Sequence, residues 1–582
     1  MKYKSIVGWL ALYAGLFAFL QIYSRFHFYY IEQNQLFQFT GEYMQTKIGE
    51  PGGFALLLGE FLVQFFALPY RGAALTAALL CGCGFLAHRM LRRIAPRQNT
   101  FFLACLPVFG LLFIHFDFNY LFQGSVAYLL ALFFLDGCTR LSGQRVRLGM
   151  SLLLTPLLFW AGGAVAILFA VCMALWELLE NGMKGYPALL LILEAACLGG
   201  WGLHASLIGE VRIAFLPDAY YHPGLAGGPA LYYAWIALPV AILLASLQKS
   251  RPALSTRRKV FEGSLQIAFL AGIAWLGVGL YGDRASAPMK EIDYYTRTRQ
   301  WDQIIRKCQG PLSNYLYICS LNMALAEKGE LADRMFAFDQ RGVQGMLVPW
   351  NKSAVVSTLL SDIYFTIGDI ALSQEMAFES YVSTTGEGNP RMLQRLIQTN
   401  LIYGAYPVAE KYLDRLSHTF CYRAWAKEHR KFLYNDDAVA ADSLLGQKRK
   451  NLPVDNQLFH ASRIVADLQS LIEQNPSNPV PIHYLGALCL LSKDLGHFKD
   501  VVEKYYGTTA LPALPRSFQE AVITLSEKDP GYWKQFNVSE SVRSRFLEYK
   551  RQILAHKNNP STLPGLMKRA YGDTYWFYFM FK

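Results

Sequence analysis

Two carboxylates follow apolar segments closely, and both could do chemistry at a membrane surface. Glu32 lies shortly after the apolar run that ends at Tyr23, and Asp117 lies in the short break between two further apolar runs. Ionisable groups beside a bilayer core are costly to keep there and are often functional. Such a carboxylate can accept the proton of an attacking hydroxyl. It can also bind a divalent cation that neutralises a phosphate leaving group.

Five cationic or titratable side chains in loops expected on the same side of the membrane could contact a phosphorylated substrate: Arg25, His27, Arg71, Arg212 and His222. A guanidinium binds phosphate oxygens through charge-assisted, often bidentate hydrogen bonds. No Cys/His spacing suits zinc, so the sequence specifies no metal ligands. The sequence therefore predicts no certain cofactor, and a divalent cation near a catalytic carboxylate is the one alternative.

Each candidate also has an explanation that involves no chemistry. Glu32 is explained equally well as an ordinary carboxylate at the membrane interface, and Asp117 as the N-terminal cap of the helix after it. Arg212 and His222 occupy an irregular loop rich in Pro and Gly, of a kind that often holds functional residues. The side chains alone leave open whether the chain is an enzyme.

Long apolar segments position these loops and fill residues 1–282. A membrane-spanning helix needs roughly 20 mostly apolar residues. The predicted spans are 5–23, 72–88, 100–116, 119–136, 148–160, 162–179, 187–205, 230–247 and 261–281. Segment 53–68 reaches only about 24 Å at about 1.5 Å per residue. We expect it to lie in the interface, with the polar stripe of Glu60 and Gln64 facing outward.

Basic residues concentrate in alternate loops, which fixes the expected orientation. They follow the second, fourth, sixth and eighth predicted spans, and positive loops stay in the cytoplasm. The first apolar run has no small-residue cleavage site, so it is expected to be a retained anchor. The expected location is the inner (cytoplasmic) membrane of a Gram-negative cell, crossed many times, with residues 283–582 in the periplasm.

Charge narrows the possible partners of the chain, and the positions of the cysteines indicate their expected state. The net charge is +12, but the cations of the first half lie in short topology-setting loops, and no nucleic-acid motif occurs. Nucleic acid is therefore excluded as a partner. Most of the 10 cysteines lie in apolar runs and are expected to be buried thiols. Cys308 and Cys319 would face an oxidising compartment, and the sequence leaves their pairing open.

Residues 283–582 form a different, water-soluble region of short helix pairs. Glycines recur at the pair turns, at Gly329, Gly368, Gly404 and Gly496, where a helix end favours a residue that tolerates positive φ. The segments 322–333 and 401–413 resemble tetratricopeptide repeats with a poorly kept period. The predicted class is therefore all-α: a polytopic membrane domain followed by an α-solenoid whose groove suits an extended partner.

Two segments of this region have separate predictions. The polar stretch 435–456 includes Lys448, Arg449 and Lys450, and we expect a linker or excursion that splits the array. The tail 575–581 is almost entirely aromatic, and it should pack on the array or touch the membrane surface.

The order of parts in residues 1–140 resembles the GT-C fold of membrane glycosyltransferases. The shared parts are a first span, an outer loop with Glu32, a Pro-containing turn at 50–53, an interfacial helix, and a second span that ends in arginines. Asp117 would match a second acidic residue of that fold, whereas the usual acidic pair at the first position is absent because Gln33 follows Glu32. The whole chain also resembles an uncharacterised family of polytopic Gram-negative envelope proteins.

The GT-C resemblance implies a glycosyltransferase that uses a polyprenyl-phosphate-linked sugar from the membrane. Glu32 and Asp117 would then be catalytic, and the repeats would bind an extracytoplasmic protein or glycan acceptor. The alternative is a non-enzymatic, membrane-anchored scaffold for envelope or glycan assembly. A transporter fits less well, because the spans show no inverted repeat and contain few ionisable residues.

Overall fold

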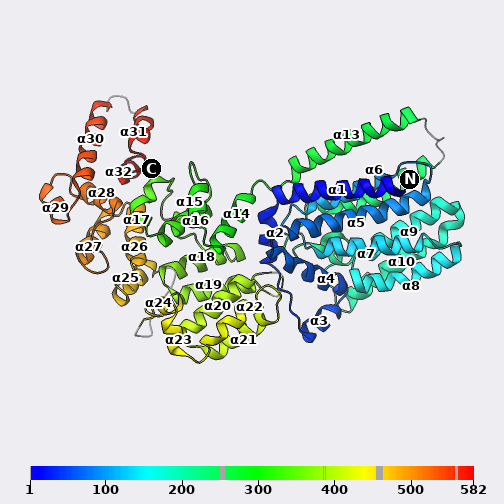
Figure 1. Ribbon diagram of the computed structural model, residues 1–582, viewed down its shortest axis with the longest axis horizontal. Coiled ribbons are helices and arrows are strands. Elements are labelled where there is room, and N and C mark those ends of the chain that lie inside the picture. Colours follow the sequence, from blue (N-terminus) through cyan, green and yellow to red (C-terminus); the bar gives the residue numbers. More distant parts are fainter. Residues whose placement is uncertain (1, 250–255, 385, 387, 454–462, 557–560) are drawn as a thin grey trace. The chain divides into compact units, whose positions relative to one another are not determined.

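The computed structural model describes residues 2–249, 256–384, 386, 388–453, 463–556 and 561–582 (Figure 1). Within these residues the chain forms helices and no strand, apart from two isolated backbone bridges, so the predicted all-α class is confirmed. Two compact units result: Met1–Pro288 with His418–Cys421, and Met289–Ser417 with Tyr422–Lys582. The division predicted from the sequence lies after residue 282.

Five stretches of the first unit are long and apolar enough to cross a membrane: Ser5–Tyr23, Arg71–Ile94, Val165–His204, Ala230–Gln248 and Val260–Tyr281. This count, made over the described residues, is lower than the nine predicted spans. Part of the difference is one merged stretch. The predicted spans 162–179 and 187–205 correspond to α9 (Val165–Asn181) and α10 (Leu189–His204), which η2 (Gly182–Ala188) joins end to end.

The other three predicted spans form helices that do not meet the same criteria. They are α6 (Phe101–Ile114), α7 (Gln123–Cys138) and α8 (Gln144–Gly162). The 14 residues of α6 rise about 21 Å, which is less than the roughly 30 Å of a hydrocarbon core. Two arginines in the first turn of α8 make that helix less apolar.

Glycines allow close helix packing in this unit. A Cβ at Gly110 of α6 would lie 2.6 Å from the backbone nitrogen of Ala234 in α12 (Ala230–Gln248). A Cβ at Gly84 of α5 (Arg71–Ile94) would lie 2.3 Å from the ring of Trp9 in α1 (Lys2–Tyr23). Small residues at contacts are typical of membrane helices, because apolar surface alone gives no preference for protein over lipid.

One long apolar helix packs little against the rest of its unit. Only 6% of the apolar window of α13 (Thr256–Tyr281) is buried, compared with 61% for α5. Figure 1 shows α13 at the margin of the bundle. The exposed faces include Trp275 and Leu276, and such side chains are stable when lipid covers them.

Arginine–carboxylate clusters join the helix ends on one side of the bundle. Asp136 at the end of α7 is buried and pairs with Arg93 at 2.6 Å, with Arg89 at 3.4 Å, and with Arg140. Arg147 of α8 pairs with the buried Glu177 of α9 at 2.6 Å. Most of these arginines are in loops or loop-flanking turns that the sequence analysis placed in the cytoplasm.

The segment expected to be an interfacial helix is α4 (Gly53–Val63) followed by η1 (Gln64–Ala67). The expected outward polar stripe is wrong, because Glu60 and Gln64 are both buried. The preceding helix α3 (Gly41–Ile48) covers this face. Its Tyr43 hydroxyl donates a hydrogen bond to Glu60, and its Lys47 ammonium lies 4.0 Å from the same carboxylate.

The second unit contains helix pairs of the predicted kind. α18 (Ala354–Ile367) packs on α19 (Ile370–Val382), and α20 (Pro390–Tyr403) packs on α21 (Tyr406–Ser417). Gly368 and Gly404 end α18 and α20 with φ of 104° and 74°. Left-handed glycines close the helices there because other residues adopt that conformation at a cost. The unit is therefore a helical-repeat-like array.

The stretch predicted as a linker or excursion contains α23 (Asp436–Ala441) and α24 (Leu445–Arg449), and its last residues, 454–456, lie outside the described residues. Arg449 donates to the carbonyl oxygens of Leu401 and Ile402 at 2.9 and 3.0 Å, and Lys448 donates to that of Thr366 at 3.0 Å. Cations thus satisfy the carbonyl ends of α20 and α18, where the helix dipole favours positive charge.

The aromatic tail is α32 (Tyr575–Phe581), which packs on the array. Glu520 accepts a hydrogen bond from the backbone N–H of Tyr575 at 2.7 Å, and the Tyr578 hydroxyl donates to the Leu491 carbonyl at 2.9 Å. All ten cysteines are free, Cys308 and Cys319 included.

Candidate functional site

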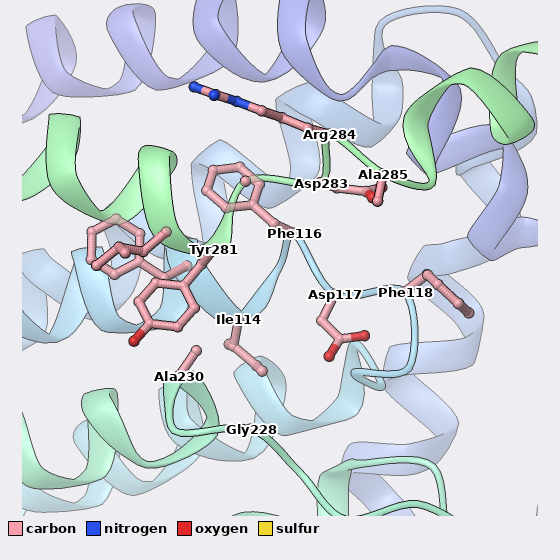
Figure 2. Close-up of a pocket in the computed structure, with 13 residues that line it drawn as sticks. Ile114, Phe116, Asp117, Phe118, Gly228, Ala230, Tyr281, Asp283, Arg284 and Ala285 are labelled. Atoms are coloured by element: carbon pink, nitrogen blue, oxygen red, sulfur yellow. The ribbon is translucent and has the colours of Figure 1, made fainter. Parts of the chain in front are cut away.

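An open cavity of about 310 Å³ lies where three apolar helices of the first unit end (Figure 2). Its wall combines the end of α6, the start of α12, the end of α13 and the residues that follow α13. The lining includes the aromatic rings of Phe116, Phe118 and Tyr281 and the charged side chains of Asp117, Asp283 and Arg284. We call this cavity the helix-end pocket.

Two loops that are distant in sequence support one wall of the helix-end pocket. Tyr120 and Tyr221 form an antiparallel bridge. The N–H of Leu121 donates to the Tyr220 carbonyl at 2.9 Å, and the N–H of His222 donates to the Asn119 carbonyl at 3.0 Å. The loop after α6 is therefore held by η3 (Pro217–Tyr220) and the residue pair after it.

Asp117 is an organised carboxylate at the centre of this wall. Its Oδ2 accepts a hydrogen bond from the Tyr221 hydroxyl at 2.7 Å, and its Oδ1 accepts from the backbone and side-chain nitrogens of Asn119 at 2.9 and 3.1 Å. Burial and the bond to this carboxylate raise the pKa of Tyr221. A carboxylate has about four acceptor positions, so roughly one remains for a ligand.

Asp283 and Arg284 follow α13 after Gly282 and complete the charged part of the lining. Asp283 accepts hydrogen bonds from the N–H and the hydroxyl of Ser286, which shapes the start of α14 (Ala287–Arg297). Figure 2 shows the Arg284 side chain extended away from Asp117. The described residues contain no group of three or more metal-ligand side chains close enough together to hold an ion.

Glu32 does not line the helix-end pocket. It is the last residue of α2 (Arg25–Glu32), it is 2% exposed, and it accepts a hydrogen bond from the Gln33 amide at 2.6 Å. The same helix reaches the Asp117 loop through Tyr30, whose ring centroid lies 5.6 Å from that of Phe118. The structure therefore brings α2 to the pocket wall but turns Glu32 into the protein.

The five residues predicted to bind substrate also lie outside the pocket lining: Arg25, His27, Arg71, Arg212 and His222. Arg212 is bonded to Glu210 and to the carbonyls of Pro223 and Leu225, and His222 accepts a hydrogen bond from the N–H of Gly224. These contacts hold the loop that supports Asp117. Arg25 stacks on Phe26, His27 is buried, and Arg71 is exposed at the start of α5.

Sequence reasoning missed Asp283 and Arg284 as pocket residues. Their signal is two charges directly after an apolar helix, the same signal that singled out Glu32 and Asp117. In the sequence, the same charge change also marks the boundary between the two halves of the chain.

A family model matches residues 2–582, which is nearly the whole chain. The chain belongs to DUF6057, a family of unknown function. No curated protein and no solved structure matches it. For this DUF6057 chain, a function must therefore be argued from the helix-end pocket and from the two units.

Proposed function

We propose that this chain is a membrane glycosyltransferase. It would take a sugar from a polyprenyl-linked donor at the outer face of the inner membrane, and the repeat array would bind the acceptor. The observation that supports this most is the helix-end pocket, which places Asp117 and Asp283 beside aromatic rings where three apolar helices end. Its volume of about 310 Å³ is at the lower end of the usual range for small-molecule sites.

The proposed reaction assigns separate tasks to the pocket's groups. An acceptor hydroxyl attacks the anomeric carbon of the donor sugar, and the bond from that carbon to the lipid phosphate oxygen breaks. The hydroxyl proton passes to the Asp117 carboxylate. The electron pair of the broken bond leaves with the lipid phosphate, whose charge Arg284 would neutralise after its side chain turns toward the pocket.

The packing around Asp117 suits this role. Three hydrogen-bond donors fix its orientation, and a catalytic group gains rate when its geometry is set before the substrate arrives. Phe116, Phe118 and Tyr281 supply apolar surface for a prenyl chain or a sugar ring. The order of parts that resembles the GT-C fold also supports the proposal, with Asp117 in place of Glu32 as the main carboxylate.

The proposal includes nine membrane-crossing helices and a periplasmic repeat array. Five stretches qualify by length and composition, and the shorter α6 and α7 would cross by local bilayer thinning. The arginine clusters at Asp136 and Glu177 would mark the cytoplasmic side.

Reporter fusions test this orientation. A reporter enzyme that works only in the cytoplasm is expected to be active when it is fused after residue 95 or 143. A reporter enzyme that works only in the periplasm is expected to be active when it is fused after residue 300. The physical reason is the retention of arginine-rich loops in the cytoplasm. A periplasmic signal at residue 95, or a cytoplasmic signal at residue 300, would contradict the proposed topology.

A non-enzymatic scaffold is the second candidate, and one observation favours it. Glu32, which the GT-C resemblance makes catalytic, is buried against Gln33 and is absent from the pocket lining. In that case Asp117 would serve only to shape its loop, through the bonds from Asn119 and Tyr221.

A comparative profile of glycans and glycoproteins separates the two candidates. Cells that lack the chain are compared with cells that carry it on a plasmid. The enzyme hypothesis expects one glycan or one set of glycoproteins to lose a specific sugar, while its unglycosylated acceptor accumulates. A scaffold would lower several assembled products together, without an acceptor that lacks one sugar, and that result would contradict the proposal.

A further inference from the structure

A second cavity, of about 200 Å³, lies within the repeat array and is strongly basic. It is bordered by the turn between α14 and α15 (Trp301–Lys307) and by residues of α16 (Tyr315–Glu327), α18, α20 and α24. The cations of its lining are Arg297, Arg299, Arg391, Arg395 and Lys448, and its carboxylates are Glu327 and Asp362. We call it the basic cavity.

The two carboxylates are already engaged. Asp362 pairs with Arg391 and also with Arg395, at 3.0 Å in the second case. Glu327 accepts a hydrogen bond from the Thr366 hydroxyl at 2.6 Å. Across the described part of the chain, Arg299 and Lys448 form no ion pair. Arg391 also pairs with Asp293, outside the lining, at 2.7 Å. The excess positive charge of the cavity therefore lies on Arg299 and Lys448.

Arg395 presents a donor without a partner. Its Nη2 binds Asp362, its Nη1 binds the Gln398 amide oxygen at 3.2 Å, and its guanidinium stacks on Phe365 at 3.6 Å from the ring centroid. The Nε–H is buried and has no hydrogen-bond partner among the described residues. Buried donors in folded proteins are nearly always satisfied, and this one lies in a residue of the cavity lining without a partner from the described chain.

Arg299 occupies a left-handed position at the end of a helix, where glycine is the usual residue. It has φ of 54° and closes α14: its N–H donates to the Thr296 carbonyl at 3.1 Å, and the next N–H, of Gln300, donates to the Tyr295 carbonyl at 2.8 Å. This is the pattern of a left-handed helix cap. A side chain there is strained, and the residue present directs a charge at the basic cavity.

Like charges are held close together around Lys448. Burial, together with repulsion from Arg395 and Arg299, lowers the pKa of Lys448 to about 8, and the Glu327 carboxylate opposes this shift. Its ammonium donates to the Thr366 carbonyl at 3.0 Å. An anion placed between Lys448, Arg299 and Arg395 would relieve this repulsion.

We propose that the basic cavity binds the phosphate group of a small phosphorylated molecule. A phosphate monoester carries a charge between −1.5 and −2 near neutral pH and has three strong acceptor oxygens, which matches the unneutralised cations. Trp301 and Trp425 add aromatic surface to the wall for the body of the ligand. The inference is independent of glycosyl transfer at the helix-end pocket.

The phosphate could belong to a soluble metabolite or to a lipid headgroup, and the test separates the two. Full-length protein in nanodiscs of a neutral lipid is titrated in a calorimeter with three probes. These are a hexose 1-phosphate, a short-chain phosphatidic acid, and the unphosphorylated hexose as a blank. Binding of either phosphate probe supports the inference and identifies the source, provided that the blank does not bind. Failure of both probes to bind overturns it.

Two exposed arginines provide a matched pair of variants. Arg299→Gln removes a charge from the basic cavity without breaking an ion pair in the described structure. Arg306→Gln removes a similar charge from α15 outside the lining. We expect Arg299→Gln to weaken binding of the phosphate probe about tenfold or more, as the loss of a charge-assisted hydrogen bond does, and Arg306→Gln to leave it unchanged. Equal weakening by both variants would indicate only general electrostatic attraction and would overturn the site.

A third variant separates binding from folding. Arg299→Gly relieves the left-handed backbone strain, so the thermal midpoint should stay the same or rise while binding weakens as in Arg299→Gln. Unchanged binding in Arg299→Gly would show that the arginine side chain is not part of the site.

Discussion

Replacement of Asp117 by asparagine is expected to abolish sugar transfer while the chain remains in the membrane at its normal abundance. Asparagine has nearly the same shape and can keep its oxygen toward Tyr221 or Asn119, so the loop should hold. It cannot take a proton from an acceptor hydroxyl. Loss of a general base typically lowers the rate by about 10²- to 10⁴-fold. The measurement is the glycan profile of complemented cells at matched abundance.

Asp218→Asn is the matched control. Asp218 lies in the loop that supports Asp117 and accepts a similar bond, from the Tyr232 hydroxyl at 2.6 Å, but it does not line the helix-end pocket. Its variant should keep transfer. If Glu32→Gln abolished transfer while Asp117→Asn kept it, the base would be Glu32, and the helix-end pocket would not be the reaction site.

Asp136→Ala is expected to give the largest loss of stability in the first unit. The carboxylate is buried and binds the guanidinium of Arg93 at 2.6 Å, and Arg89 and Arg140 share it. Removal of one partner of a buried ion pair typically costs about 3–5 kcal/mol. These arginines retain partial contact with solvent, so we expect about 3 kcal/mol. Thermal unfolding of the purified protein in detergent measures it.

Glu180→Gln is the control for this second variant. Glu180 pairs with Lys249 at 2.8 Å, and both side chains are exposed. Exposed pairs contribute about 0–1 kcal/mol, so its thermal midpoint should remain close to that of the original protein. Equal effects of the two variants would contradict a special role for the Asp136 cluster.

The helical class and the two-part organisation could be predicted because they depend on local patterns. Apolar runs and pair-turn glycines are readable along the chain, and Gly368 and Gly404 do end helices with positive φ. Span lengths were predicted less well. One span was predicted to extend to residue 116, but α6 ends at Ile114. The apolar run in the sequence is longer than the helix because Phe116 is apolar and yet lies in the loop after it.

The site depends on contacts between distant segments, which one sequence does not reveal. The helix-end pocket joins Asp117, the start of α12 and Asp283, and nothing in their local sequences indicates that they meet. Glu60 was expected to face outward, and this prediction failed because its partner Tyr43 lies in another helix, 17 residues earlier. Glu32 had the same local signal as Asp117, but the turn of α2 buries it.

The central claim is that the chain transfers a sugar from a membrane lipid. The most direct test uses membrane vesicles supplied with polyprenyl-linked sugars that carry a radioactive label in the sugar. The label that reaches the protein and glycan fraction is counted. Vesicles that contain the chain should transfer label, and vesicles that lack it or contain Asp117→Asn should not. Equal transfer in all three would contradict the account.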